Sequence, residues 1–105
     1  MARKIGIDYI LDENRQPIKV EGSVALFWWT KHPDAGKVGE ATVGSSRIIT
    51  SFRGQQLGRN EPPHCFDTQI FSAFFDRHGE TYVSWEAAVA GHARWGAAGQ
   101  AAEDA

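Results

Sequence analysis

Two stretches decide the fold of this chain: RIITSF at residues 47–52 and FDTQIFSAFF at residues 66–75. The first is rich in β-branched and aromatic residues, which favour the pleated, half-buried surface of a central strand. The second mixes apolar and polar residues on both faces, which indicates burial on one face and partial cover on the other. We therefore predict that 47–53 pairs with 66–75 at the centre of an antiparallel sheet.

Further strand signals lie on both sides of this pair. Residues 5–10 alternate in polarity, and a turn cluster at 12–15 separates them from a second alternating stretch at 16–20. Such a pattern predicts a hairpin. Two short strands and one more turn are also expected, the strands at 38–43 and 81–83 and the turn at 76–79.

Residues 23–32 predict a short helix. Ser23 is a candidate N-cap, and Pro33 stops the element near His32. The positions i, i+3, i+4 and i+7 of this helix are filled by Val24, Phe27, Trp28 and Lys31. Three apolar residues would then share one face. A buried strand fits the same stretch, because a short apolar run is ambiguous by periodicity alone.

A longer helix is expected after Ser84, whose hydroxyl suits an N-cap. One face of this helix would carry Trp85, Ala88, Val89 and His92. We interpret His92 as a buried histidine that is hydrogen-bonded between this helix and the sheet. Gly91 beside it indicates a close approach of helix and sheet. Gly96 and Gly99 are expected to end the helix.

These elements predict an α+β fold. We expect an antiparallel, twisted sheet of four to five strands, with the C-terminal helix packed on one face and the short helix near 23–32 beside it. Because 105 residues are one domain's worth, we expect a single domain over 1–96 and a flexible C-terminal tail over 97–105.

Composition excludes several classes of protein. Cys65 is the only cysteine, so an internal disulfide is impossible. No apolar run approaches the roughly 20 residues that span a bilayer, and residues 1–10 do not resemble a signal peptide. We therefore expect a cytoplasmic protein. The net charge of −2 argues against an open surface for a polyanion.

No arrangement of catalytic or metal-binding residues stands out, so we expect no enzymatic activity, no metal and no cofactor. The histidines and the cysteine are scattered, without the spacing of a zinc site. His64 and Cys65 are adjacent and would point to opposite faces of a strand. Glycine fingerprints of phosphate and dinucleotide sites are absent, as is a nucleophile elbow.

The connection from Arg53 to His64 is long for a compact domain, which favours a functional loop. Residues 41–60 hold three arginines and no acid. Arginine is favoured at recognition surfaces because its planar fork binds carboxylates and phosphates in pairs of hydrogen bonds. The alternative interpretation of the connection is a solvated hairpin tip. The alternative interpretation of the arginines is that residues 41–60 and the acidic residues 61–86 form neighbouring strands whose charges offset each other.

Trp28 and Trp29 are adjacent, and adjacent side chains on a helix diverge by about 100°. Trp29 is therefore expected to be the more exposed of the two, although both could belong to the core. The predicted binding surface consists of Arg47, Arg53, Gln55, Gln56, Arg59, Asn60 and Trp29.

Four motifs carry a resemblance to a known family. They are YILDEN with Pro17 at 9–17, IITSFRG at 48–54, PPHCFDTQIF at 62–71, and ETYVSWEA with Gly91-His92 at 80–92. They resemble a widespread family of small tailed-phage and prophage proteins, which run from an LDENGNP-like start through STVFLG and PPxxFETMIF to YxTWEEAxxGH. The likeness covers roughly residues 9–95.

This resemblance implies a role in phage biology. We expect a phage-encoded anti-defence protein of the anti-CRISPR kind, which binds and blocks a host protein or ribonucleoprotein complex, such as a CRISPR–Cas effector, in the host cytoplasm. The alternative is a structural, assembly or nucleic-acid-binding accessory protein of the phage. Where the family has Leu-Asp-His and a glycine run, this chain has Gln55 to Arg59, so an activity of that loop is not carried over.

Overall fold

The computed structural model of the chain describes residues 8–59, 61–72 and 76–105. The elements follow each other as β1 (Asp8–Leu11), β2 (Pro17–Val20), α1 (Gly22–Lys31), β3 (Lys37–Val43), β4 (Ser46–Phe52), β5 (Phe66–Phe71), β6 (Asp76–Tyr82) and α2 (Trp85–Asp104). The predictions for residues 5–7 and 73–75 lie outside the described residues. The turn predicted at 76–79 is wrong, because β6 already begins at Asp76.

The strands form two antiparallel sheets, one of four strands in the order β3-β4-β5-β6 and one made by the hairpin β1-β2. The central pair runs from Arg47 opposite Phe71 to Phe52 opposite Phe66. This confirms the predicted central pairing and the α+β fold. The predicted hairpin is also confirmed over the residues that the structure describes, with Asp8 opposite Val20.

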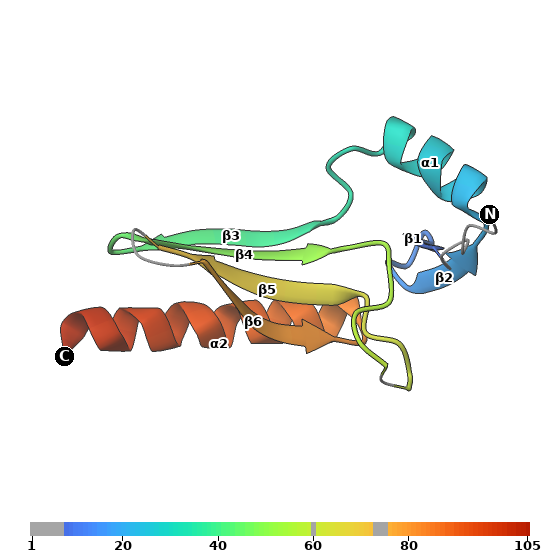
Figure 1. The fold of residues 1–105 in the computed structure, drawn as a ribbon. Coiled ribbons are helices and arrows are strands. Elements are labelled where there is room, and N and C mark those ends of the chain that lie inside the picture. The colour runs from blue at the N-terminus through green and yellow to red at the C-terminus, as the bar shows by residue number, and fades with distance from the viewer. Residues whose placement is uncertain (1–7, 60, 73–75) are drawn as a thin grey trace, which may run out of the picture.

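Helix α2 covers one face of the four-stranded sheet and contacts all four of its strands (Figure 1). Its N-terminus is capped as predicted, because the Ser84 hydroxyl oxygen accepts a hydrogen bond of 3.1 Å from the Ala87 N–H. Ala88 and Gly91 are buried against the sheet, and Gly91 leaves room for the Tyr82 ring. Val89, predicted on the same face, is 47% exposed.

The predicted end of α2 at Gly96 and Gly99 is wrong, since the helix continues to Asp104. Glycine lowers helix propensity, but tertiary contacts override such a preference. At Gly99 a Cβ would lie 3.3 Å from the Val43 side chain, so the helix is packed against the end of β3 at that point. The segment predicted as a flexible tail is therefore mostly helical.

Residues 22–31 form a helix, as favoured, but the predicted cap and face of that helix are wrong. Glu21 is its N-cap and gives no side-chain hydrogen bond. Ala25 is the buried residue, whereas Val24 and Phe27 are 47% and 70% exposed. The side that packs inward carries Ala25, Trp28 and Trp29, at the i, i+3 and i+4 positions of one face. Neither helix in the described part of the chain has the length and apolar character that crossing a membrane requires.

An aromatic cluster joins α1 to the core. The Trp29 ring stacks on Phe52 with centroids 5.8 Å apart and planes 17° apart. Trp28 meets Trp29 edge-on, Phe52 meets Phe66 at 5.2 Å, and Phe66 meets Trp85 edge-on at the start of α2. Such pairs stabilise a fold beyond the area that they bury.

A chain of polar side chains lies between α2 and the sheet, and we call it the polar chain. It runs from His92 through Thr50, Thr68 and Tyr82 to Glu80. The oxygen of Thr50 lies 2.7 Å from His92 Nδ1 and 2.6 Å from the Thr68 oxygen, which lies 2.8 Å from the Tyr82 oxygen. The prediction that His92 is hydrogen-bonded between helix and sheet is confirmed.

The direction of every hydrogen bond in the polar chain follows from its acidic end. Burial alone would raise the pKa of Glu80, but hydrogen bonds from Arg94, Trp95 and Tyr82 outweigh it and hold that pKa below its usual value. An ionised carboxylate only accepts, so the Tyr82 hydroxyl donates to it. Thr68 then donates to Tyr82 and Thr50 to Thr68, which leaves His92 Nδ1–H to donate to Thr50.

Candidate binding site

The residues predicted as a binding surface do not gather in one place. Arg47 lies beside the β3-β4 turn, and its Nη2 pairs with the Glu40 carboxylate at 3.0 Å. Arg53 follows the opposite end of β4. Five residues of extended strand, 48–52, separate them, which places their backbones about 20 Å apart, so one small ligand cannot contact both arginines.

Arg53 is engaged within the fold. Its Nη1 lies 3.0 and 3.2 Å from the two carboxylate oxygens of Asp67, whose side chain is 0% exposed. A buried carboxylate needs such a partner, because an unpaired charge in the interior is costly. The Arg53 side chain is 40% exposed, so it lies at the surface, but its guanidinium is already paired with Asp67.

The connection from Arg53 to His64 is fastened to the hairpin β1-β2 and to itself. The Gly54 carbonyl accepts a hydrogen bond of 2.8 Å from the Tyr9 N–H, and the His64 carbonyl accepts one of 2.7 Å from the Leu57 N–H. Of the predicted residues in this connection, Gln55 and Arg59 are exposed, Gln56 is half-buried, and Asn60 lies outside the described residues.

Trp29 is half-buried, so it is not the outward aromatic that was expected. Two glycines explain why. Gly36 and Gly54 lie against its ring, and a Cβ at Gly54 would be 3.1 Å from Trp29 Nε1. Gly54 has a φ of +75°, a conformation that glycine adopts without strain, so the chain can turn closely around the indole.

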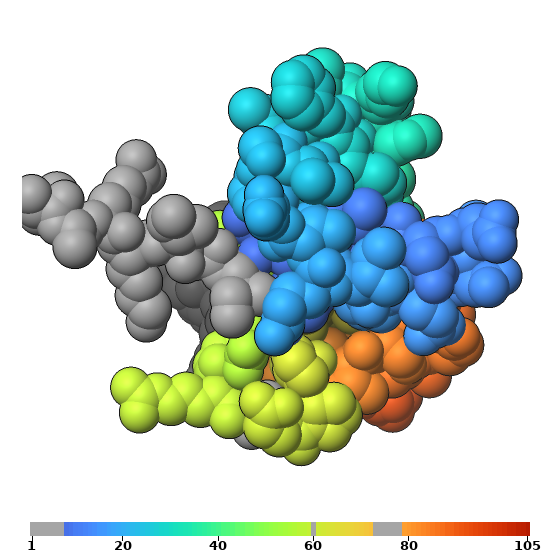
Figure 2. All heavy atoms as spheres, turned by 90° about the vertical axis from the view of Figure 1, so that its right-hand side faces the viewer, coloured from blue at the N-terminus to red at the C-terminus, as the bar shows by residue number. Residues whose placement is uncertain are grey.

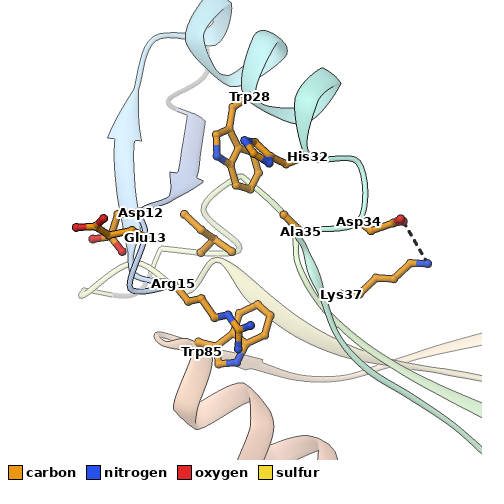
Figure 3. Close-up of a pocket in the computed structure, with 10 residues that line it drawn as sticks. Asp12, Glu13, Arg15, Trp28, His32, Asp34, Ala35, Lys37 and Trp85 are labelled. Atoms are coloured by element: carbon orange, nitrogen blue, oxygen red, sulfur yellow. Dashed lines mark ion pairs between the residues drawn. The ribbon is translucent and has the colours of Figure 1, made fainter.

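The clearest concavity is a cleft of about 480 Å³ between α1, the β1-β2 turn and the start of α2 (Figure 3). We call it the aromatic cleft. It is lined by Leu11, Asp12, Glu13, Arg15, Trp28, His32, Asp34, Ala35, Lys37 and Trp85. Trp28 and His32 lie at the α1 side with their rings 5.4 Å apart, and Trp85 lies at the α2 side.

Arg15 is the unusual residue of the aromatic cleft. Its guanidinium lies over the Trp85 ring, 4.6 Å from the centroid. Its backbone φ is +62°, in the left-handed region, and it is the one residue other than glycine with a positive φ in the described part of the chain. A long side chain at such a position is uncommon.

The acidic residues of the cleft are committed to local contacts or turned outward. Asp12 Oδ1 accepts hydrogen bonds from the backbone N–H groups of Asn14 and Gln16, at 2.8 and 2.9 Å. Asp34 pairs with Lys37 at 3.3 Å. Figure 3 shows the Glu13 carboxylate directed away from Arg15 and Trp28.

A second surface lies on the outer face of α1. Val24, Leu26 and Phe27 are 47%, 66% and 70% exposed. The helix stands off the sheet at the end of the molecule that carries the hairpin, on the side opposite α2 (Figure 1). Figure 2 shows this end face on, with α1 above the hairpin and the 53–65 connection below it. We call these three side chains the apolar ridge.

Cys65 and His64 do not form a reactive pair. Cys65 is 0% exposed, and burial raises the pKa of its thiol to about 11, so the thiol stays protonated at neutral pH. His64 Nδ1 lies 2.7 Å from the Thr81 hydroxyl. Within residues 8–59, 61–72 and 76–105, no three His, Cys, Asp or Glu side chains come together as metal ligands.

Comparison with known proteins leaves the family open. No family model, no curated protein and no solved structure matches the chain. The membership in the phage family therefore stays a prediction from the four motifs. The apolar ridge and the aromatic cleft are the features that indicate a function.

Sequence reasoning missed the residues of both surfaces. Arg15 was assigned to a turn, and its left-handed backbone leaves no mark in the sequence. Leu26 and Phe27 stand in a helix that is apolar nearly all round, so periodicity could not say which side faces solvent. One sequence signal was available, namely that adjacent aromatic residues in a helix cannot all face inward. It was applied to Trp29, whereas the exposed aromatic residue of this helix is Phe27.

Proposed function

We propose that this protein is a non-enzymatic binding protein that docks on a protein partner through the apolar ridge of α1. Following the motif resemblance, we infer that it is a phage anti-defence protein whose partner is a host defence complex of the CRISPR–Cas kind. The ridge carries this proposal, because adjacent large apolar side chains in solvent mark interaction sites, whereas singly scattered ones do not.

The arrangement of α1 suits a helix that enters a groove on a partner. Leu26 and Phe27 are 66% and 70% exposed, and Val24 precedes Phe27 by nearly one turn, which is the spacing of anchors in helix-in-groove recognition. The opposite side of the helix is fixed by the aromatic cluster through Trp28 and Trp29. A helix held in this way is ordered before binding, which lowers the entropic cost of association.

Two observations favour binding over catalysis or nucleic-acid contact. The Cys65 thiol is buried and protonated, so it is a poor nucleophile. Arg47 and Arg53 already pair with carboxylates, and they lie at opposite ends of β4. A track of unpaired cations along a phosphate backbone, which nucleic-acid binding requires, is not formed by the described arginines of the predicted surface.

The test is affinity capture from the host with the full chain as bait. Wild type is compared with Leu26→Ser/Phe27→Ser, and captured proteins are identified by mass spectrometry. We expect the variant to keep its melting temperature within a few degrees, because exposed side chains contribute little to stability. We expect it to lose the partner by about 2 kcal/mol or more, roughly 30-fold, if these residues are the anchors.

Val89→Ser is the matched control, because Val89 is an exposed apolar residue on α2, away from the ridge. Capture of the same proteins by wild type and the ridge variant would contradict the docking site. The inhibitor role is tested separately by the plating efficiency of a phage on a defended host that expresses the chain. Stoichiometric presence in purified particles would instead indicate a virion component.

A further inference from the structure

The backbone at Arg15 holds a conformation that favours glycine. A φ of +62° places the Cβ too close to the following carbonyl oxygen, so a residue with a side chain is strained there. Strain at a single non-glycine residue persists only where the surrounding structure holds it, and such residues cluster at binding sites. The Arg15 side chain must therefore be considered for a function.

Several contacts fix Arg15 at the wall of the aromatic cleft. Its N–H donates a hydrogen bond of 2.9 Å to the Asp12 carbonyl, and its guanidinium lies over the Trp85 ring. Gln16 Nε2 donates to Glu86 Oε1 at 3.1 Å, which ties the same turn to the first turn of α2. The guanidinium is thus placed before any ligand arrives, so little rotamer entropy remains to be lost on binding.

Stacking leaves the donors of Arg15 available. A guanidinium that lies on an aromatic ring uses its flat face, while its N–H groups point outward from the edge. Among the residues that the structure describes, none accepts a hydrogen bond from the Arg15 guanidinium or from the His32 imidazole. Both groups line the aromatic cleft (Figure 3). Arg15 and His32 can therefore offer N–H donors to a ligand in the cleft.

The carboxylates around the cleft limit the kind of anion that fits. Asp12, Glu13 and Asp34 lie at its rim, and a polyanion that runs across the rim would be repelled by them. A single compact anion reaches Arg15 without passing along that row. The indole rings of Trp28 and Trp85 offer apolar surface in the same cleft. Such surface suits the aliphatic part of an acidic protein side chain.

We propose that the aromatic cleft receives one carboxylate of a protein partner, an aspartate or glutamate side chain that Arg15 binds through two hydrogen bonds. This inference rests on the proposed function for the protein nature of the ligand, and it adds the chemistry of the contact. Arginine on carboxylate in this bidentate geometry gives a strong, directional contact. The His32 imidazole lines the same cleft and offers a further ring nitrogen to the ligand.

The test is an NMR titration of the full chain with the single-glutamate peptide acetyl-Gly-Gly-Glu-Gly-Gly-amide. The resonances followed are the arginine Nε–H groups and the tryptophan indole N–H groups. We expect saturable shifts of Arg15 and Trp85. Arg15→Gln is expected to weaken the peptide at least about tenfold. Arg15→Lys is expected to weaken it as well, because an ammonium neither stacks in this way nor donates in parallel pairs.

Arg47→Gln is the matched control, since Arg47 is an arginine at the far end of β4 whose partner is Glu40. An equal loss in Arg47→Gln and Arg15→Gln would overturn the proposal and indicate a general charge effect. Equal binding of acetyl-Gly-Gly-Gln-Gly-Gly-amide would also overturn it. Tighter binding of the oligonucleotide (dT)8 than of the acidic peptide would indicate a phosphate site instead.

This titration needs no identified partner, so it fails or succeeds independently of capture through the apolar ridge. Loss of peptide binding in Arg15→Gln with normal capture would separate the two surfaces. Absence of any Arg15 shift, together with loss of capture in the ridge variant, would overturn the carboxylate site and leave the proposed function standing.

Discussion

At the interface of α2 with the sheet, each side chain from His92 to Glu80 is hydrogen-bonded to the next. Beneath α1, by contrast, the Arg15 guanidinium lines a cleft and donates a hydrogen bond to none of the described residues. The two regions use polar groups for different ends. In the first, the polar chain fixes the distance and register of α2, because each buried hydroxyl would cost free energy if left alone. In the second, the left-handed backbone of Arg15 and its stacking on Trp85 hold a guanidinium in the aromatic cleft, where a ligand can replace water.

The comparison also separates two uses of glycine. Gly39 and Gly91 lie where a Cβ would meet the side chains of the polar chain, namely the His92 and Tyr82 rings. Arg15 stands at a backbone conformation where glycine would be easier. At the α2 interface, glycine stands where a Cβ would collide with a neighbouring ring. At the aromatic cleft, Arg15 stands where the backbone conformation favours glycine.

The largest effect is expected for Gly91→Ala. The added methyl group collides with the Tyr82 ring, so α2 must move away from the sheet and the polar chain must stretch. We expect a loss of about 3 kcal/mol in the free energy of unfolding, at the upper end for overpacked sites. Urea denaturation measures it.

Gly96→Ala is the matched control on the same helix, because no atom lies within 4 Å of a Cβ built there. We expect it to gain about 0.5–1 kcal/mol from helix propensity. A Gly91→Ala protein as stable as wild type would contradict the close approach of helix and sheet.

Removal of one hydroxyl from the middle of the polar chain is expected to cost less. Thr68→Val keeps the shape of a side chain that is 0% exposed but leaves Thr50 without an acceptor and Tyr82 without a donor. We expect a loss of about 1–3 kcal/mol, the usual cost of orphaned buried groups. Thr42→Val on the exposed side of β3 should stay within about 0.5 kcal/mol of wild type. Equal losses in the two variants would mean that the hydrogen bonds do not matter.

The sequence allowed the α2 side of this comparison to be predicted in good part. The central strands could be identified because β-branched and aromatic residues concentrate at 47–52, and Gly91-His92 stood in a helix that had to pack on them. The length of α2 could not, because the two glycines near its end argue for a stop that contact with Val43 overrides. Local preference is weak beside tertiary packing.

The α1 side could not be predicted for a different reason. Helix α1 has apolar residues on every side, so two helical phases fit it equally well by pattern. The choice between them is made by Gly36 and Gly54, which come from other segments and make room for Trp29. The left-handed backbone at Arg15 likewise depends on the turn that Asp12 closes.

A smaller effect is expected when the acidic end of the polar chain is titrated. The pKa of Glu80 is lowered in the folded protein, so its contribution to stability is present above the ordinary carboxyl pKa of the unfolded chain. That contribution is lost as the pH falls through the lowered folded pKa. Between roughly pH 5 and pH 3, the interval over which such a carboxylate titrates, the free energy of unfolding should therefore fall less for Glu80→Gln than for wild type.

Urea denaturation at several pH values measures this difference. Because the Glu80 side chain is 42% exposed, solvent screens it and the effect is expected to be modest. Glu13→Gln controls for the loss of one surface charge. Parallel stability curves for wild type and Glu80→Gln would mean that the Tyr82 hydroxyl does not depend on an ionised acceptor.

The smallest change in stability is expected for Arg15→Gly, and its small size is informative. Glycine relieves the left-handed strain, which stabilises the fold by about 1–2 kcal/mol. It also increases the entropy of the unfolded chain and removes the contact with Trp85, and each of these two losses costs about 0.5–1 kcal/mol. The three effects nearly cancel, so we expect a net change within about 0.5 kcal/mol of wild type. Arg15→Ala keeps the strain and loses the contact, and should be the less stable of the two. If alanine proves as good as glycine at this position, then Arg15 is not strained, and the backbone gives no reason to assign its side chain a function.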